Sequence, residues 1–132
     1  MRFYIEKEFE HAGLKCVCAA TNGGWRCGYV GVNKEHPAYA VDYWDVENIS
    51  VHGGLTFSHG QDQNFLAGNY WWFGFDCNHF GDGIDKTLLD DTTRKEFGFM
   101  AELEGEVRTL EFVESECKSL AEQLAAMKGV NP

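Results

Sequence analysis

The sequence predicts an α+β domain, built as a twisted antiparallel β-sheet followed by a long C-terminal helix. Short apolar and aromatic segments separated by glycine-rich turns occupy the N-terminal half, which is typical of antiparallel strands. Near the C-terminus, apolar residues recur at helical spacing. The 132 residues, with 44% hydrophobic and 24% charged side chains, suit a single globular domain over residues 1–132.

Three strands are expected first. Residues 3–8 alternate between apolar and polar side chains, residues 14–20 (LKCVCAA) form a second strand, and residues 26–32 (RCGYVGV) form the third. A turn at 11–15 joins the first two strands, and Asn22 followed by Gly23 predicts a primed hairpin turn before the third. The glycines within 26–32 indicate that other groups approach this strand closely.

The middle of the chain alternates between loops and strands. Residues 34–43 are expected to form a loop or short helical turn, and residues 49–57 a strand interrupted by Gly53 and Gly54. Residues 58–69 are polar and indicate an exposed loop. Residues 70–76 (YWWFGFD) form the most buried strand, and because its side chains alternate between faces, a helix or a second subunit must cover the other side. Residues 84–105 are expected to be mostly loop with a short helical turn.

Residues 107–127 are predicted to form the C-terminal helix, with Gly129 as its terminator. An apolar stripe, with steps of three and four residues, consists of Leu110, Val113, Cys117, Leu120, Leu124 and Met127. Glu114, Lys118 and Glu122 are spaced for i,i+4 ion pairs on another face. We expect the stripe to be buried against the sheet or a partner, and a dimer would supply a partner helix for any half left exposed.

The charge balance restricts the classes of partner. The chain has 11 Lys and Arg against 21 Asp and Glu, for a net charge of −10. A surface this acidic repels nucleic acid and anionic membranes at long range. A small anionic ligand remains compatible, because a few arginines gathered in one pocket can override the mean field. The five cysteines, without a signal peptide or a long apolar run, indicate reduced thiols in a cytosol, serving as small apolar fillers.

One candidate cluster combines His52 with Asp76, His79 and Asp82. Imidazole and carboxylate groups are metal-ligand types, and this spacing places the last three near one strand end. The same residues also suit a tight structural loop in which the carboxylates accept backbone N–H groups, His79 bonds a carbonyl and His52 fixes a bend. The spacing matches no strong metal signature, so both interpretations stand.

A second cluster consists of cations and an aromatic ring. Arg108 precedes the long helix, where a cation opposes the helix dipole and calls for an acidic neighbour or an anionic ligand. With Arg26 it forms a candidate phosphate fork, and Lys34, Lys86, Arg94 and Lys95 are possible helpers. Phe80 lies in a glycine-bounded loop, where its ring is available to stack on a purine. Neither a nucleophile motif nor a phosphate-binding glycine motif appears, so catalysis is not expected.

Four strings carry a family resemblance: RCGYVGV at 26–32, VHGGLTF at 51–57, WFGFDCNHFGD at 72–82 and VESECKSLAEQL in the helix at 113–124. Over residues 14–127 the chain resembles small phage and prophage proteins, more specifically the first Thoeris anti-defence family. The resemblance implies a sponge and not an enzyme. Proteins of this family bind cyclic ADP-ribose isomers made by TIR-domain proteins and hold them intact between subunits, which blocks bacterial immune signalling.

The resemblance also implies particular residues and an assembly. The matching ligand-binding positions are Arg26, Phe80 and Arg108, with His79 in the pocket wall. A polar contact falls at 90–91, where this chain has Asp90 and an amide would suit a phosphorylated ligand better. A homodimer that can assemble into a hexamer is implied, with a separate site for cyclic trinucleotides in some members. No cofactor is expected, and the implied location is the cytoplasm of the infected bacterium.

Two other classes of function remain open on the sequence. A metal-dependent hydrolase of a nucleotide signal would use His52, Asp76, His79 and Asp82. A phage structural or host-interaction protein would bind no small ligand.

Overall fold

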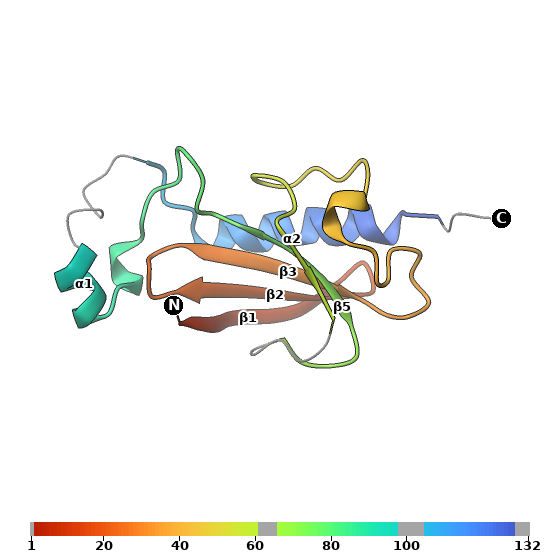
Figure 1. Ribbon diagram of the computed structural model, residues 1–132, viewed down its shortest axis with the longest axis horizontal. Helices are drawn as coiled ribbons and strands as arrows, with labels where there is room; N and C mark the ends of the chain where they lie inside the picture. Colours follow the sequence, from red (N-terminus) through yellow and green to blue (C-terminus); the bar gives the residue numbers. More distant parts are fainter. Residues whose placement is uncertain (1, 61–65, 98–104, 129–132) are drawn as a thin grey trace.

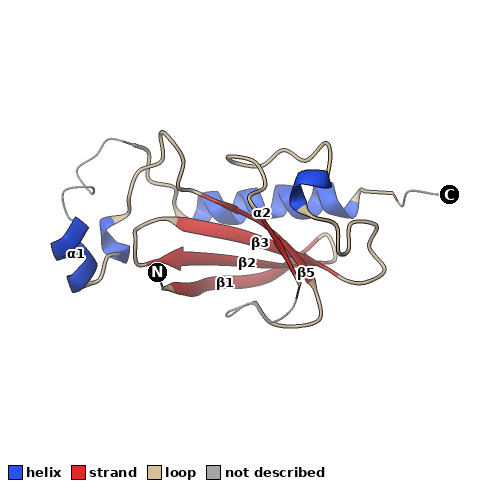
Figure 2. Ribbon diagram, in the orientation of Figure 1, coloured by secondary structure: helices blue, strands red, loops and turns tan. Residues whose placement is uncertain are grey.

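The computed structural model describes residues 2–60, 66–97 and 105–128. Within these ranges five antiparallel strands form one sheet in the order β1-β2-β3-β5-β4, and α2 lies along one face of it (Figure 1; Figure 2). The elements are β1 (Phe3–His11), β2 (Leu14–Thr21), β3 (Arg26–Val32), β4 (Phe57–His59), β5 (Trp71–Asp76) and α2 (Leu110–Ala125). The predicted α+β architecture, a sheet followed by a C-terminal helix, is confirmed.

Two hairpins join the first three strands. Ala12 and Gly13 both have positive φ, at 54° and 78°, so a tight primed-type turn links β1 to β2. The β2–β3 turn differs from the prediction, because the positive φ falls at Gly24 (96°) and not at Asn22 or Gly23. A Cβ atom on Gly24 would lie 2.2 Å from the Ile84 side chain, so this glycine also lets the turn dock against residues 84–85.

The glycines of β3 allow close packing, as expected. A Cβ atom on Gly28 would lie 2.4 Å from the ring of Phe75 and 2.6 Å from the Cys117 sulfur. Gly28 therefore lets α2 and a β5 side chain both approach the backbone of β3. This contact lies at the centre of the core between the helix and the sheet, whose fully buried residues include Val30, Phe73 and Leu120.

The opposite face of the sheet carries a second apolar cluster. Trp72 of β5 is fully buried there and packs with Val17, Tyr29 and Leu66. The aromatic side chains of β5 therefore alternate between the two faces, as the sequence predicts. Within the described residues, α2 covers only the Phe73 side of this strand.

The strand predicted at 49–57 is wrong for most of its length. Only Phe57–His59 forms a strand (β4), and Gly53 and Gly54 turn the chain with φ of 69° and 80°. Side chains of α2 bind the backbone before this bend. The N–H groups of Ser50 and His52 donate to Gln123 and Glu116 at 2.8 Å, so helix side chains take the place of strand partners.

Shorter helical elements occupy the expected loops. The 3-10 turn η1 (Tyr43–Asp45) ends the 34–43 loop, while η2 (Lys86–Leu88) and α1 (Asp91–Phe97) form the helical part of 84–105. Residues 98–104, part of the predicted 58–69 loop, and the expected terminator Gly129 lie outside the described residues.

The C-terminal helix begins at Leu110, three residues later than predicted. The hydroxyl of Thr109 accepts the N–H of Phe112 at 3.1 Å, so Thr109 is the N-cap and Arg108 lies outside the helix. Of the predicted stripe, Val113, Cys117, Leu120 and Leu124 are fully buried by the chain's own sheet, while Leu110 and Met127 are partly buried. The stripe therefore calls for no partner helix, which corrects the expectation of a half-exposed seam. Of the predicted helix ion pairs, Glu114–Lys118 forms at 3.2 Å.

All five cysteines are free thiols and all are buried, which agrees with their expected role as apolar fillers. None of the described helices combines the length and the apolar character that a membrane crossing requires.

Replacing Leu120 by Asp should unfold or severely destabilise the protein. Leu120 is fully buried between α2 and the sheet, so the substitution removes an apolar side chain and buries a charge. We expect the free energy of unfolding to fall by roughly 3 kcal/mol or more, measured by urea denaturation. Ser115→Asp, at an exposed position of the same helix, is the control and should change stability little. Equal stability of the two variants would contradict the packing of α2.

Candidate functional site

The predicted site residues gather at one end of the sheet, where the β2–β3 turn, residues 77–90, α1 and the start of α2 meet (Figure 1). Arg26, the first residue of β3, is nearly buried, with its side chain 9% exposed. Its guanidinium donates two hydrogen bonds to the carboxylate of Glu6, at 2.7 and 3.3 Å. Its Nη1 also donates to Asp85 at 3.0 Å and to the main-chain oxygen of Arg108 at 3.1 Å. The donors of Arg26 are therefore committed to the protein itself.

A bulge in β1 positions the partner of Arg26. The register of β1 against β2 shifts between Ile5 and Lys7, which leaves Glu6 as the extra residue. Burial alone would lower the pKa of Arg26. The ion pairs with Glu6 and Asp85 raise it by more than burial lowers it, so the pKa lies above its ordinary value. Asp85 shows the opposite balance: burial raises its pKa, while bonds from Thr87 and Arg26 bring it below the ordinary value.

Asp82 is the centre of a second ion-pair cluster, and its side chain is only 2% exposed. It accepts the Nε of Arg108 at 2.8 Å, the Nε2 of His52 at 2.9 Å and the backbone N–H of His79 at 3.0 Å. Burial raises the pKa of Asp82, yet these bonds outweigh burial and the pKa lies below 3.8. Arg108 also pairs with Glu106 at 2.9 Å and lies over the ring of Phe112.

The four residues proposed as metal ligands are close together but are arranged in two pairs. His52 contacts Asp82, and the Nε2 of His79 lies 3.0 Å from Asp76 without the geometry of a hydrogen bond. The two imidazole rings are 6.1 Å apart. Among the residues that the structure describes, no group of three or more His, Cys, Asp or Glu side chains is placed to hold a metal ion. As the polar-loop interpretation expects, Asp76 and Asp82 accept the backbone N–H groups of Asn78 and His79 at 3.0 Å, whereas the Nε2 of His79 binds no carbonyl of the described residues.

Phe80 is the most exposed apolar side chain of the described residues, with a relative exposure of 109%. It follows His79 and precedes Gly81, whose φ of 93° turns the chain. The ring is thus presented to solvent at the tip of a loop, next to the Asp82 cluster in sequence.

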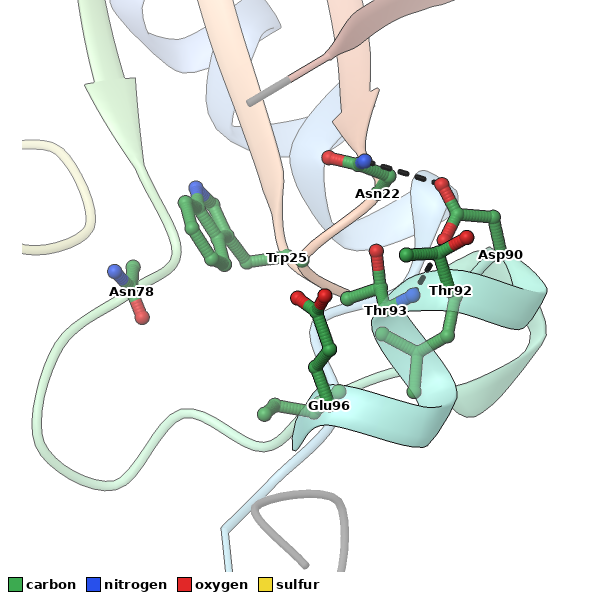
Figure 3. Close-up of a pocket in the computed structure, with 10 residues that line it drawn as sticks. Asn22, Trp25, Asn78, Asp90, Thr92, Thr93 and Glu96 are labelled. Carbon is green, nitrogen blue, oxygen red and sulfur yellow. Dashed lines mark hydrogen bonds between the residues drawn. The ribbon is translucent and has the colours of Figure 1, made fainter. Parts of the chain in front are cut away.

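A cavity of about 580 Å³ lies at the same end of the sheet, between the β2–β3 turn, the 78–90 segment and α1 (Figure 3). Its lining residues are Asn22, Gly23, Trp25, Asn78, Ile84, Leu89, Asp90, Thr92, Thr93 and Glu96. A second cavity, of about 540 Å³, lies beside residues 37–49 and the C-terminal end of α2, and none of the predicted site residues line it.

Asp90 is the one predicted site residue that lines the first cavity. It accepts the N–H of Thr93 at 2.7 Å and the side-chain amide of Asn22 at 3.2 Å, so it caps α1 and ties that helix to the hairpin turn. Hydrogen bonds from Thr93 are the main reason that its pKa falls to about 2. Asp90 is therefore ionised at neutral pH, with both oxygens engaged.

Sequence reasoning missed most of the cavity wall. Trp25 is one of many aromatic residues in the sequence. Only its position beside the hairpin turn could have indicated that it lines a cavity. Asn78 and Glu96 carried no signal, because only the docking of α1 against the hairpin brings them to one cavity. The cavity is not lined by the other predicted ligand residues, which are Arg26, His79, Phe80 and Arg108.

Three of the buried thiols are not activated as nucleophiles. Burial is the main cause that raises the pKa of Cys16, Cys27 and Cys77 to about 12. Such thiols stay protonated at neutral pH and are poor nucleophiles.

Comparisons with known proteins found no matching family model, no similar curated protein and no similar solved structure.

The ion pairs of Asp82 and Asp85 should make the fold sensitive to acid. Because the pKa of each is lower in the folded protein, their stabilisation is complete above the unfolded value of 3.8 and is lost as the pH falls through the folded value. Asp82→Asn should cost about 1–3 kcal/mol at pH 7 and flatten the loss of stability in acid. Urea unfolding at a series of pH values measures both effects.

The matched control is Asp45→Asn, because Asp45 is exposed and has no side-chain partner among the described residues. It should keep the stability and the acid sensitivity of the wild type. If Asp82→Asn lost stability in acid as steeply as the wild type, the Asp82 cluster would not be the source of the acid sensitivity.

Proposed function

We propose that the protein is a phage anti-defence sponge, which binds a cyclic ADP-ribose-type immune signal in the host cytoplasm and holds it without cleaving it. The observation that carries the proposal is the cavity beside Trp25. Its volume of about 580 Å³ falls within the range of about 300–1,000 Å³ common for small-molecule sites. It combines an aromatic ring with amide, hydroxyl and carboxylate groups. The four sequence strings at 26–32, 51–57, 72–82 and 113–124 add the resemblance to the anti-defence family.

The diphosphate of such a ligand needs a cation, and Arg108 is the better candidate of the two arginines. Its Nη1 pairs with Glu106, whose side chain is 74% exposed, and an exposed ion pair is worth about 0–1 kcal/mol. A phosphate could therefore replace Glu106 at little cost while the Nε of Arg108 stays on Asp82. Arg26 is paired with partly buried carboxylates and binds the Arg108 carbonyl, so its role in the proposal is to position Arg108.

Phe80 supplies the second aromatic surface. Its ring is fully exposed at a loop tip and is therefore accessible for stacking on a base. In the proposal, the ring covers the ligand, and a second copy of the chain completes the site in a homodimer that can assemble further. Because the α2 stripe is already buried, this assembly would use the loop end of the sheet rather than helix pairing.

Capture followed by heat release tests the function directly. The protein is mixed with a cyclic ADP-ribose isomer, freed of unbound nucleotide, heated, and the released material is analysed by chromatography. We expect intact nucleotide, and we expect chelator treatment to leave capture unchanged. Cleaved product, lost on chelation and restored by zinc or manganese, would establish the metal-dependent hydrolase instead. No retention of any cyclic nucleotide would overturn the sponge and leave a structural or host-interaction role.

Calorimetric titration of site variants tests the assignment of residues. Arg108→Ala should weaken binding at least tenfold by removing charge-assisted hydrogen bonds worth about 1.5–3 kcal/mol each. Phe80→Ala should lose about 1–3 kcal/mol of stacking. Glu106→Gln should bind at least as tightly as the wild type, because it frees Arg108. Trp44→Ala, which removes another exposed ring, is the control. Wild-type affinity in both Arg108→Ala and Phe80→Ala would leave Arg108 as a salt-bridge residue only.

A further inference from the structure

We propose that the cavity beside Trp25 takes a nucleoside whose ribose 2′- and 3′-hydroxyls are free, with the base on the Trp25 ring and these hydroxyls on Glu96, and that Glu96 rejects a ribose phosphorylated at this diol. The inference rests on the proposed function, since it names the part of the signal that this cavity holds. It assigns ligand contacts to residues outside the set that the sequence indicates.

The walls of the cavity suit a flat, partly apolar group. Trp25 is half-buried, so part of its surface remains accessible, and Ile84 and Leu89 add an apolar surface. Stacking of a base on an aromatic side chain is favourable for every base, because each has a π-face. The side-chain amide of Asn78 lies on the other side of Trp25 from α1 and can donate to and accept from a base edge (Figure 3).

The charge of the cavity excludes phosphate. None of the ten lining residues is a lysine or an arginine, whereas two of them, Asp90 and Glu96, are carboxylates. A phosphate placed here would face like charge without a compensating cation in the lining, and such juxtaposition is unfavourable. The diphosphate must therefore lie outside the cavity, which agrees with its proposed contact at Arg108.

The two carboxylates differ in what they can still bind. Both oxygens of Asp90 already accept hydrogen bonds, from Thr93 and Asn22. Glu96 is exposed, and no hydrogen bond or ion pair joins it to any other residue that the structure describes. Its side chain extends from α1 toward Trp25 (Figure 3). A carboxylate with free oxygens beside a stacking ring can accept hydrogen bonds from the two neighbouring hydroxyls of a ribose. In dinucleotide-binding folds, an Asp or Glu side chain binds the ribose in this way.

Titration of the ¹⁵N-labelled protein with adenosine and with adenosine 2′-monophosphate tests the inference by NMR. The two probes share the base and differ in whether the ribose diol is free. We expect adenosine to shift the indole N–H signal of Trp25, identified by its absence in Trp25→Phe, and to bind at least tenfold more tightly than the 2′-phosphate. Glu96→Gln should keep the fold and reduce this preference at least threefold, because it removes the charge that repels phosphate.

Glu35→Gln is the matched control, since Glu35 is exposed and lies outside the lining of the cavity, and it should keep the full preference. The inference is overturned if adenosine leaves the Trp25 signal unmoved at millimolar concentration, if the 2′-phosphate binds as well as adenosine, or if Glu96→Gln keeps the wild-type preference. Failure of the sponge has a different signature: adenosine binds at Trp25 as described, while no cyclic ADP-ribose isomer is retained in the capture assay.

Discussion

Arg26 is the residue on which the loop end of the molecule depends. Its guanidinium joins the bulge of β1, through Glu6, to Asp85 and to the main-chain oxygen of Arg108. Four segments that are distant in sequence therefore meet on one nearly buried cation. Removing one partner of such a cluster leaves the other charges uncompensated, which is costlier than any single surface ion pair. The positions of the 84–90 segment and of the start of α2 follow from this constraint.

The charged groups at this end of the molecule differ widely in how exposed they are. Arg26 and Asp82 have side chains that are 9% and 2% exposed, Arg108 is 20% exposed, and Glu106 is 74% exposed. The buried ion pairs keep the segments that carry them in place, because separating one would leave an uncompensated charge away from water. Exterior pairs can exchange partners at little cost. In the proposal, an anion replaces Glu106 at Arg108 while the buried bond from Arg108 to Asp82 is kept.

In the proposal, the uncharged part of the ligand binds in the cavity and its charged diphosphate binds at Arg108. The rigid part of the structure is the sheet with α2, where Gly28 lets the helix approach closely and a row of fully buried apolar residues fills the interface. The groups proposed to bind the ligand lie on the turn, loop and short helix that this scaffold carries, and binding residues are commonly found on loops held by a rigid scaffold. Trp25 and Glu96 present a ring and an acceptor, whereas the cation stands apart from them at Arg108. A ligand that is a nucleoside at one end and a diphosphate at the other would satisfy both regions.

The sequence by itself determined the elements whose signal is local. Short apolar segments beside turn signals placed β2, β3 and β5. The helical spacing of Val113, Cys117, Leu120 and Leu124 placed α2, because burial on one face repeats along a helix. The tertiary structure alone decided what depends on distant segments. Residues 49–56 satisfy the strand pattern, yet their backbone is bound by Gln123 and Glu116 of the helix and turned by two glycines, so no strand forms there. The partners of Arg26 and the wall of the cavity likewise come from segments up to 82 residues apart. Local patterns carry no information about such pairings, because a side chain's neighbours are set only when the hairpin turn, α1 and the start of α2 dock together.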